Sequence, residues 1–137
     1  MSVANAMLLL TSLTLPVRWR DLDAFNHVNN STYLTWIEET RLHWMANLPG
    51  EWMNADYSPL LAAVHVNYRR AAAWPANVVV ELYCERLGNT SVTLAHRIVD
   101  ASDREVLYSD GHSVMVWVGA NGKPVTLPEV IRTACAT

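Results

Sequence analysis

The chain has 137 residues and a net charge of −3, with 51% hydrophobic and 17% charged residues. This length suits one domain with a usable core, so we expect a single domain over residues 1–137. The acidic balance argues against a nucleic-acid binder, which needs a basic face. A typical soluble domain is ~25% charged, so we expect part of this surface to be covered in an oligomer.

Signals for membrane insertion, secretion and metal binding are weak. No run approaches the ~18 apolar residues of a membrane span, so no membrane partner is expected. Met7–Leu15 is apolar, but no Lys or Arg precedes it, and we interpret it as the lead into the first strand. Cys84 and Cys135 lack C-x-x-C spacing, which argues against zinc and against a disulfide framework. We therefore expect a cytoplasmic protein without a bound metal.

The first predicted elements are a strand, a polar loop and a helix. Alternating apolar and charged residues predict a short strand over Leu15–Arg20. The polar loop Asp21–Asn30 follows and leads into a predicted helix over Ser31–Leu48, which Asn30 or Ser31 can cap.

The predicted helix has one apolar face that carries a charge. Because a half-buried Arg needs a partner, we expect Arg41 to pair with Glu38, three residues earlier. The apolar residues of this face are Tyr33, Leu34, Ile37, Trp44, Met45 and Leu48.

The rest of the chain alternates as strands do. Hairpins this rich in apolar side chains cannot leave both faces in water, so the helix must cover one face of an antiparallel sheet. The sequence therefore predicts an α+β fold. The predicted strands are Ala62–Arg70, Asn77–Arg86, Ser91–Asp100 and Glu105–Val118, with a tight turn at residues 87–90 and a last helical turn at residues 128–132.

The loop Asp21–Asn30 holds two acids, a His and three Asn directly before a helix start. A helix start offers unpaired N–H groups and a partial positive charge, which can hold a polarised carbonyl or an oxyanion. A nearby carboxylate could act as general base or nucleophile. The same residue types are also common in loops that only cap a helix, so spacing alone leaves both readings open.

Residues 20–41, RDLDAFNHVNNSTYLTWIEETR, resemble the signature of hot-dog-fold thioesterases of the 4-hydroxybenzoyl-CoA thioesterase-like branch. The stretch is also similar to the matching part of plant acyl-ACP thioesterases. The resemblance implies an antiparallel sheet wrapped around one long central helix, dimers with a continuous sheet, often tetramers, and active sites at the subunit interface. It implies hydrolysis of an acyl-CoA thioester, or of an acyl-carrier-protein thioester, with no metal or redox cofactor and with coenzyme A only as part of the substrate.

The resemblance also assigns roles to residues of the loop. Asp23 matches the catalytic acid, acting as general base or nucleophile. His27 matches the His of the H-V-N-N form and is expected to hydrogen-bond to Asp23, to water or to the leaving thiolate. Asn30 falls where a helix-start N–H polarises the thioester carbonyl. Asn26 replaces a Gly of many relatives; it could keep the loop's shape by adopting positive φ, or join the site as a polar group.

Other residues extend the predicted site. Tyr68, Arg69 and Arg70 end a predicted strand, where the Arg pair could hold the phosphates of coenzyme A or could simply be solvated. Asp21 is expected to bond the local turn or Arg20 rather than to act in catalysis.

Two alternatives remain beside these assignments. His65, His96 and His112 lack H-x-H spacing, so no metal site is expected among them. A non-catalytic acyl-binding hot-dog domain is the alternative to an enzyme, and the joint presence of Asp23 and His27 speaks against it.

Overall fold

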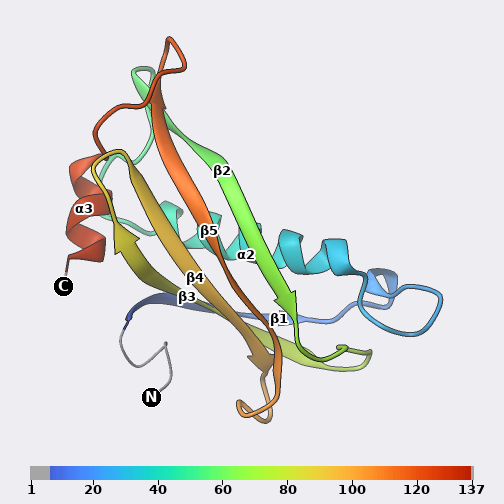
Figure 1. Cartoon of the computed structure of the whole chain (residues 1–137). Coiled ribbons are helices and arrows are strands. Elements are labelled where there is room, and N and C mark those ends of the chain that lie inside the picture. The colour runs from blue at the N-terminus through green and yellow to red at the C-terminus, as the bar shows by residue number, and fades with distance from the viewer. Residues whose placement is uncertain (1–6, 137) are drawn as a thin grey trace.

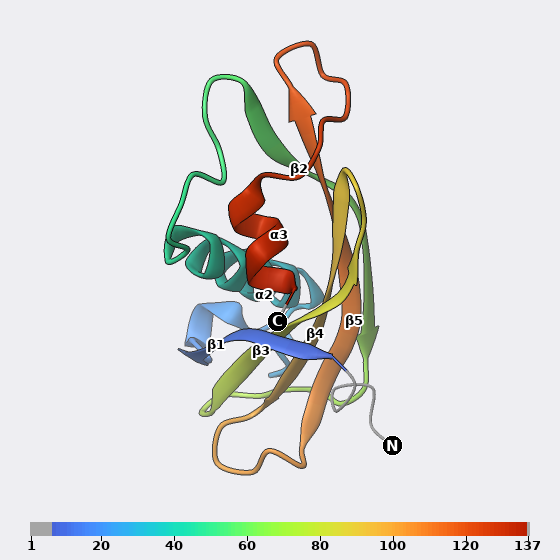
Figure 2. The same cartoon turned by 90° about the vertical axis from the view of Figure 1, so that its left-hand side faces the viewer.

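The computed structural model describes residues 7–136, which form one curved sheet with two α-helices on the same face (Figures 1 and 2). The expected domain, residues 1–137, also includes residues 1–6 and 137, which lie outside the described residues. No helix within the described range is long and apolar enough to cross a membrane. The elements are β1 (Leu8–Pro16), the 3-10 turn η1 (Trp19–Asp21), α2 (Asn30–Ala46), β2 (Tyr57–Tyr68), β3 (Asn77–Leu87), β4 (Ser91–Asp100), β5 (Leu107–Gly119) and α3 (Glu129–Cys135).

The sheet is antiparallel throughout, with the strand order β1-β3-β4-β5-β2. It curls around α2, which crosses its concave face, while the shorter α3 lies on the same side (Figure 2). β2 pairs only with β5 and therefore forms one edge of the sheet. The predicted α+β fold, a hot-dog fold with a sheet wrapped around one long helix, is confirmed.

The prediction for the start of the chain is wrong in its details. The first strand is Leu8–Pro16 rather than Leu15–Arg20, so the stretch interpreted as a lead is the strand itself. It pairs along its length with β3, which the local alternation of residues 15–20 could not reveal. The chain then turns into η1, where the Arg18 N–H donates to Asp21 Oδ2 at 2.7 Å. The expectation that Asp21 bonds the local turn is confirmed.

The central helix matches its prediction closely, but its cap differs. α2 runs over Asn30–Ala46, and the capping residue is Asn29 rather than Asn30 or Ser31. The Asn29 side-chain oxygen accepts the Ser31 N–H at 3.0 Å. The helix therefore begins one residue earlier than predicted, with Asn30 as its first residue.

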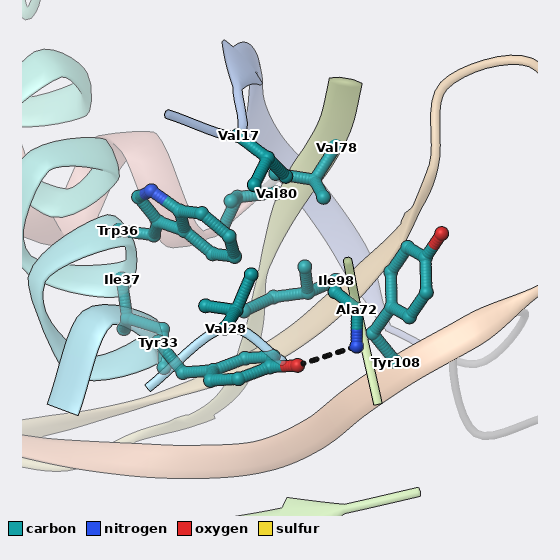
Figure 3. Close-up of a cluster of buried hydrophobic side chains, with 10 residues drawn as sticks. All are labelled: Val17, Val28, Tyr33, Trp36, Ile37, Ala72, Val78, Val80, Ile98 and Tyr108. Carbon is teal, nitrogen blue, oxygen red and sulfur yellow. Dashed lines mark hydrogen bonds between the residues drawn. The ribbon is translucent and has the colours of Figure 1, made fainter. Parts of the chain in front are cut away.

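Two apolar clusters hold α2 against the sheet. The first lies under its N-terminal half, where Tyr33, Trp36 and Ile37 pack on β3 and β4 residues such as Val80 and Ile98 (Figure 3). The second lies under its C-terminal half and joins α2 to β5 and α3; its largest members are Trp44, Met45, Trp117 and Ile131. Leu34, predicted on the apolar face, is 41% exposed instead. It belongs to a stripe of α2 that the sheet does not cover.

The predicted ion pair between Glu38 and Arg41 is not formed. Glu38 is exposed, whereas Arg41 is buried against the sheet and donates from Nη1 to Ser113 Oγ at 3.2 Å. Burial lowers the pKa of Arg41, and the nearby charge of Glu38 opposes that shift. The partner of Arg41 is therefore a strand hydroxyl 72 residues away in sequence, which helix spacing could not indicate.

Candidate active site

The loop before α2 closes around the carboxylate of Asp23. Asp23 Oδ1 accepts the backbone N–H groups of Phe25 at 2.8 Å and His27 at 3.2 Å. The Asp23 N–H donates to the His27 carbonyl at 2.7 Å, and Leu22 and Val28 form a β-bridge across the loop. One carboxylate oxygen is thus fixed by the loop, while Oδ2 has no hydrogen-bond partner among residues 7–136.

The turn of this loop depends on Asn26, which has a φ of 60°. Asn adopts this left-handed conformation at modest cost, whereas Gly adopts it at none. The expectation that Asn26 preserves the loop is confirmed. Asn26 does not line the hollow in which the other predicted residues meet.

The start of α2 leaves one amide free. The Asn29 N–H donates to the Asp21 carbonyl at 2.8 Å, and Ser31 and Thr32 donate to the side chain and carbonyl of Asn29. Every other amide between residues 25 and 32 also donates within the described chain, except that of Asn30. The Asn30 N–H therefore combines an open bonding position with the partial positive charge of a helix N-terminus.

Asp23 and Asn30 open onto a common hollow of about 270 Å³. Six of the seven predicted site residues line it, and Asn26 is the exception. The remaining lining residues are Val28, Tyr33 and Ala71. A larger hollow of about 510 Å³ lies over β2, β4 and β5 and shares only Arg69 with the first. The larger hollow contains neither Asp23 nor Asn30.

His27 meets Asp23 through its backbone rather than through its ring. The His27 N–H donates to Asp23 Oδ1, whereas the imidazole forms no hydrogen bond within residues 7–136. Of the three partners expected for the ring, Asp23 is therefore not bound in this arrangement. The ring remains available to water or to the leaving group.

The three residues at the strand end that lines the hollow differ in their contacts. The Tyr68 hydroxyl donates to the Asn30 carbonyl at 3.2 Å. Arg69 Nε lies 3.0 Å from Asp110 Oδ1, so part of its charge is balanced by a carboxylate. Arg70 forms no ion pair with a carboxylate of the described chain. The two Arg residues, equivalent in the sequence, thus differ in electrostatic character.

Two residues of the candidate site were not predicted from the sequence. Tyr33 lines the hollow, and its hydroxyl accepts the Ala72 N–H at 3.3 Å. Its position three residues after Asn30, on the first turn of the helix, could have indicated it. Asp110 fixes Arg69 from 41 residues away in sequence, and no local pattern points to this pair.

The three strand histidines lie apart from this site and differ in environment. The rings of His65 and His112 stack at 5.6 Å between centroids. His96 is 1% exposed, and burial lowers its pKa to about 4. Within residues 7–136, no three His, Cys, Asp or Glu side chains converge as metal ligands would.

The chain is similar to known thioesterases in sequence and in structure. The thioesterase-like superfamily matches residues 17–135. PA2801, a candidate thioesterase from Pseudomonas aeruginosa, is 38% identical with a TM-score of 0.87, covering 93% of this chain and 99% of its own. A candidate acyl-CoA thioesterase from Xanthomonas campestris (XC229) is 44% identical with a TM-score of 0.77, covering 85% of this chain and 99% of its own.

A characterised enzyme is also similar to the chain in sequence. The long-chain acyl-CoA thioesterase FadM of Escherichia coli (strain K12) is 29% identical over 93 residues, which are 66% of this chain and 70% of FadM. The chain belongs to the thioesterase-like superfamily and is a thioester hydrolase with the hot-dog fold.

Proposed function

We propose that the protein hydrolyses acyl-CoA thioesters to a free acid and coenzyme A in the hollow between Asp23 and Asn30. The observation that carries this proposal is the pairing of a free helix-start N–H with a fixed carboxylate whose second oxygen is unbonded. A carbonyl held by the first group would be exposed to attack directed by the second. The names of FadM and the Xanthomonas protein support coenzyme A as the thiol carrier.

In this mechanism, the thioester oxygen accepts a hydrogen bond from the Asn30 N–H. Negative charge develops on that oxygen during attack, and one preorganised donor of this kind commonly contributes ~2.7–4 kcal/mol of transition-state stabilisation. The donor costs no reorganisation, because the cap on Asn29 already occupies the neighbouring amides.

Asp23 provides the second half of the reaction through Oδ2. It either removes a proton from an attacking water or attacks the carbonyl carbon itself, giving an anhydride that water then hydrolyses. In both routes a C–O bond forms, the C–S bond breaks, and the coenzyme A thiolate takes up a proton. The His27 ring, unbonded within the described chain, is suited to orient the water or to protonate the thiolate.

The arginines at the end of β2 suit the phosphates of coenzyme A. Within residues 7–136, Arg70 forms no ion pair, and the two terminal nitrogens of Arg69 have no partner while Nε binds Asp110. Charge-assisted bonds to phosphate are the strong class of hydrogen bond.

We further propose that a second copy of the chain pairs along β2 and completes the site. β2 is a sheet edge, and it exposes Leu60 (56%), Leu61 (41%) and Val64 (40%). α2 adds Leu34 and Leu42, which are 41% and 51% exposed. An edge strand with this much apolar surface is a template for pairing, and closure against a partner would exclude water from the hollow.

The test is thiol release from a panel of short, long and aromatic acyl-CoAs by wild type and Asp23→Ala. We expect release by wild type and a loss of at least ~10² in the variant, the scale of a missing acid–base group. Asp21→Asn is the matched control, because Asp21 lies two residues away and bonds only the η1 turn through its side chain.

Each alternative gives a different result in this assay. Full activity in Asp23→Ala would refute the mechanism. Hydrolysis of acyl-carrier-protein thioesters but of no acyl-CoA would change the carrier and leave the mechanism intact. No hydrolysis of either substrate would indicate an acyl-binding domain.

A further inference from the structure

The last residue of β2 is tied to the first residue of α2. The Tyr68 hydroxyl donates to the Asn30 carbonyl at 3.2 Å, although the two residues lie 38 positions apart. The Tyr68 ring also meets the Tyr33 ring edge-on, with centroids 5.2 Å apart and planes at 84°. Tyr68 therefore contacts the first turn of the helix at two points.

The tie restrains the residue that carries the free amide. Asn30 is the first helical residue, and helix ends fray more readily than helix interiors. On its N-terminal side, Asn30 is held by the capping contacts of Asn29. On its C-terminal side, Tyr68 is the only side chain of the described residues that bonds its carbonyl. The direction of the Asn30 N–H thus depends on a strand distant in sequence.

Accurate direction matters for such a donor. An oxyanion is stabilised when the donor lies ~2.7–3.1 Å from the position that the oxygen reaches in the transition state. A misplacement of ~1 Å in a catalytic arrangement can cost ~10² in rate. The Tyr68 hydroxyl itself adds little to folding stability, because the residue is 44% exposed and water can replace the bond.

We propose that Tyr68 is a positioning residue, which holds Asn30 so that its N–H meets the oxyanion. This inference rests on the proposed function, and it assigns Tyr68 a role different from the direct substrate binding expected from the sequence. Tyr68 acts through the backbone of Asn30. Its effect belongs to the transition state, where the donor is used, rather than to substrate binding.

The test replaces the hydroxyl and keeps the ring. In Tyr68→Phe we expect kcat to fall about tenfold, KM to stay within about twofold, and the melting temperature to be nearly unchanged. Tyr57→Phe is the matched control. Tyr57 begins the same strand, and its hydroxyl also donates to a backbone carbonyl, that of Glu51 at 3.0 Å, outside the hollow. This control is expected to keep the wild-type kcat.

Amide hydrogen exchange provides a readout independent of turnover. In an α-helix, the Leu34 N–H donates to the Asn30 carbonyl, so loosening of Asn30 should speed exchange in the first turns of α2. We expect faster exchange over residues 29–36 in Tyr68→Phe and an unchanged exchange rate there in Tyr57→Phe.

The outcomes separate this inference from the proposed function. Unchanged kcat or unchanged exchange in Tyr68→Phe would overturn the positioning role. A raised KM with unchanged kcat would also overturn it and make Tyr68 a substrate-binding residue. If wild type hydrolyses no thioester, the proposed function fails, and exchange alone then decides whether Tyr68 fixes the helix start.

Discussion

Two polar regions meet α2, one at its open N-terminus and one buried beneath its middle. At the N-terminus, Asp23 and the Asn30 N–H open onto a hollow. Beneath the middle, Arg41 donates to Ser113, and His96 Nε2 lies 3.2 Å from the Ser109 hydroxyl. Arg41 and His96 are 5% and 1% exposed.

Each region contains a polar atom without a hydrogen-bond partner among residues 7–136. The Asn30 N–H belongs to a residue that lines an open hollow, where we propose that it binds the substrate carbonyl. His96 Nδ1 is buried and has no hydrogen-bond partner within residues 7–136, which is energetically unfavourable for a buried polar atom. The comparison teaches that a missing partner alone does not indicate a functional group: the amide at the open helix start is accessible to a ligand, whereas the buried imidazole nitrogen is not.

The largest effect is expected from disturbing the buried region at Gly111. This residue has a φ of +153°, and a Cβ there would lie 2.0 Å from the His65 carbonyl oxygen and 2.8 Å from His96 Cε1. We expect Gly111→Ala to lower the free energy of unfolding by roughly 2–6 kcal/mol, the sum of backbone strain and overpacking. Urea denaturation measures it.

Gly122→Ala is the matched control, because Gly122 also has a positive φ of +79° but nothing lies within 4 Å of its Cβ position. Its cost should be about 1 kcal/mol, from backbone strain alone. Equal losses in the two variants would show that packing around His96 is not the sensitive feature.

The next effect is expected at the open region, when the free donor is removed. Asn30→Pro deletes the N–H at the first helical position, where Pro is well tolerated. Asn29 already has a φ of −59° and a ψ of 136°, which suits a residue before Pro. We expect kcat to fall ~10²–10³ with little change in melting temperature.

Asn30→Ala separates the two parts of this residue, because it removes the side chain and keeps the N–H. A loss in Asn30→Ala as large as in Asn30→Pro would show that the side chain, not the amide, acts in the reaction. Steady-state kinetics on the best acyl-CoA of the panel compares them.

A smaller, pH-dependent effect is expected from His96. Burial lowers its pKa from 6.5 to about 4, with Asp110 opposing the shift and Arg41, His112 and His65 adding to it. The unfolded chain therefore binds a proton between pH 6.5 and 4 that the native state does not. Stability from this group is complete above pH 6.5 and falls with decreasing pH, by up to about 3 kcal/mol near pH 4.

Denaturation curves from pH 7 to 4 measure this loss. The His96→Asn variant lacks the titrating imidazole at this position. Its free energy of unfolding should therefore fall less steeply than that of wild type over the same pH interval. Parallel curves for the two proteins would assign the acid sensitivity to other groups.

Much of this architecture could be predicted from local sequence. Ser91–Asp100 was predicted as a strand with the bounds that β4 has, and α2 was predicted to within two residues at each end. Periodicity is sufficient for α2, because one face of the helix is buried and the other is exposed, and turn residues on either side bound β4. β1 was misplaced, because its residues pair with β3 and the exposure of its faces depends on that distant partner.

The candidate site also has a part that local sequence indicated and a part that depends on residues distant in the chain. The motif around Asp23, His27 and Asn30 is contiguous, so the sequence by itself indicated these residues as candidates. It left two possibilities for Asn26, and the structure shows the positive φ. Whether the resemblance applies to catalysis stays a prediction until Asp23→Ala is measured.

Only the tertiary structure decided which groups have partners. It gave Arg41 a hydroxyl of β5 instead of Glu38, bound Arg69 to Asp110 while leaving Arg70 unpaired within the described chain, and brought Tyr68 to the start of α2. Hydrogen bonds and ion pairs depend on atoms within a few ångströms, and folding brings together residues that chain order keeps apart. The sequence determined which groups the loop carries, and the folded chain decided which of them have hydrogen-bond partners within residues 7–136.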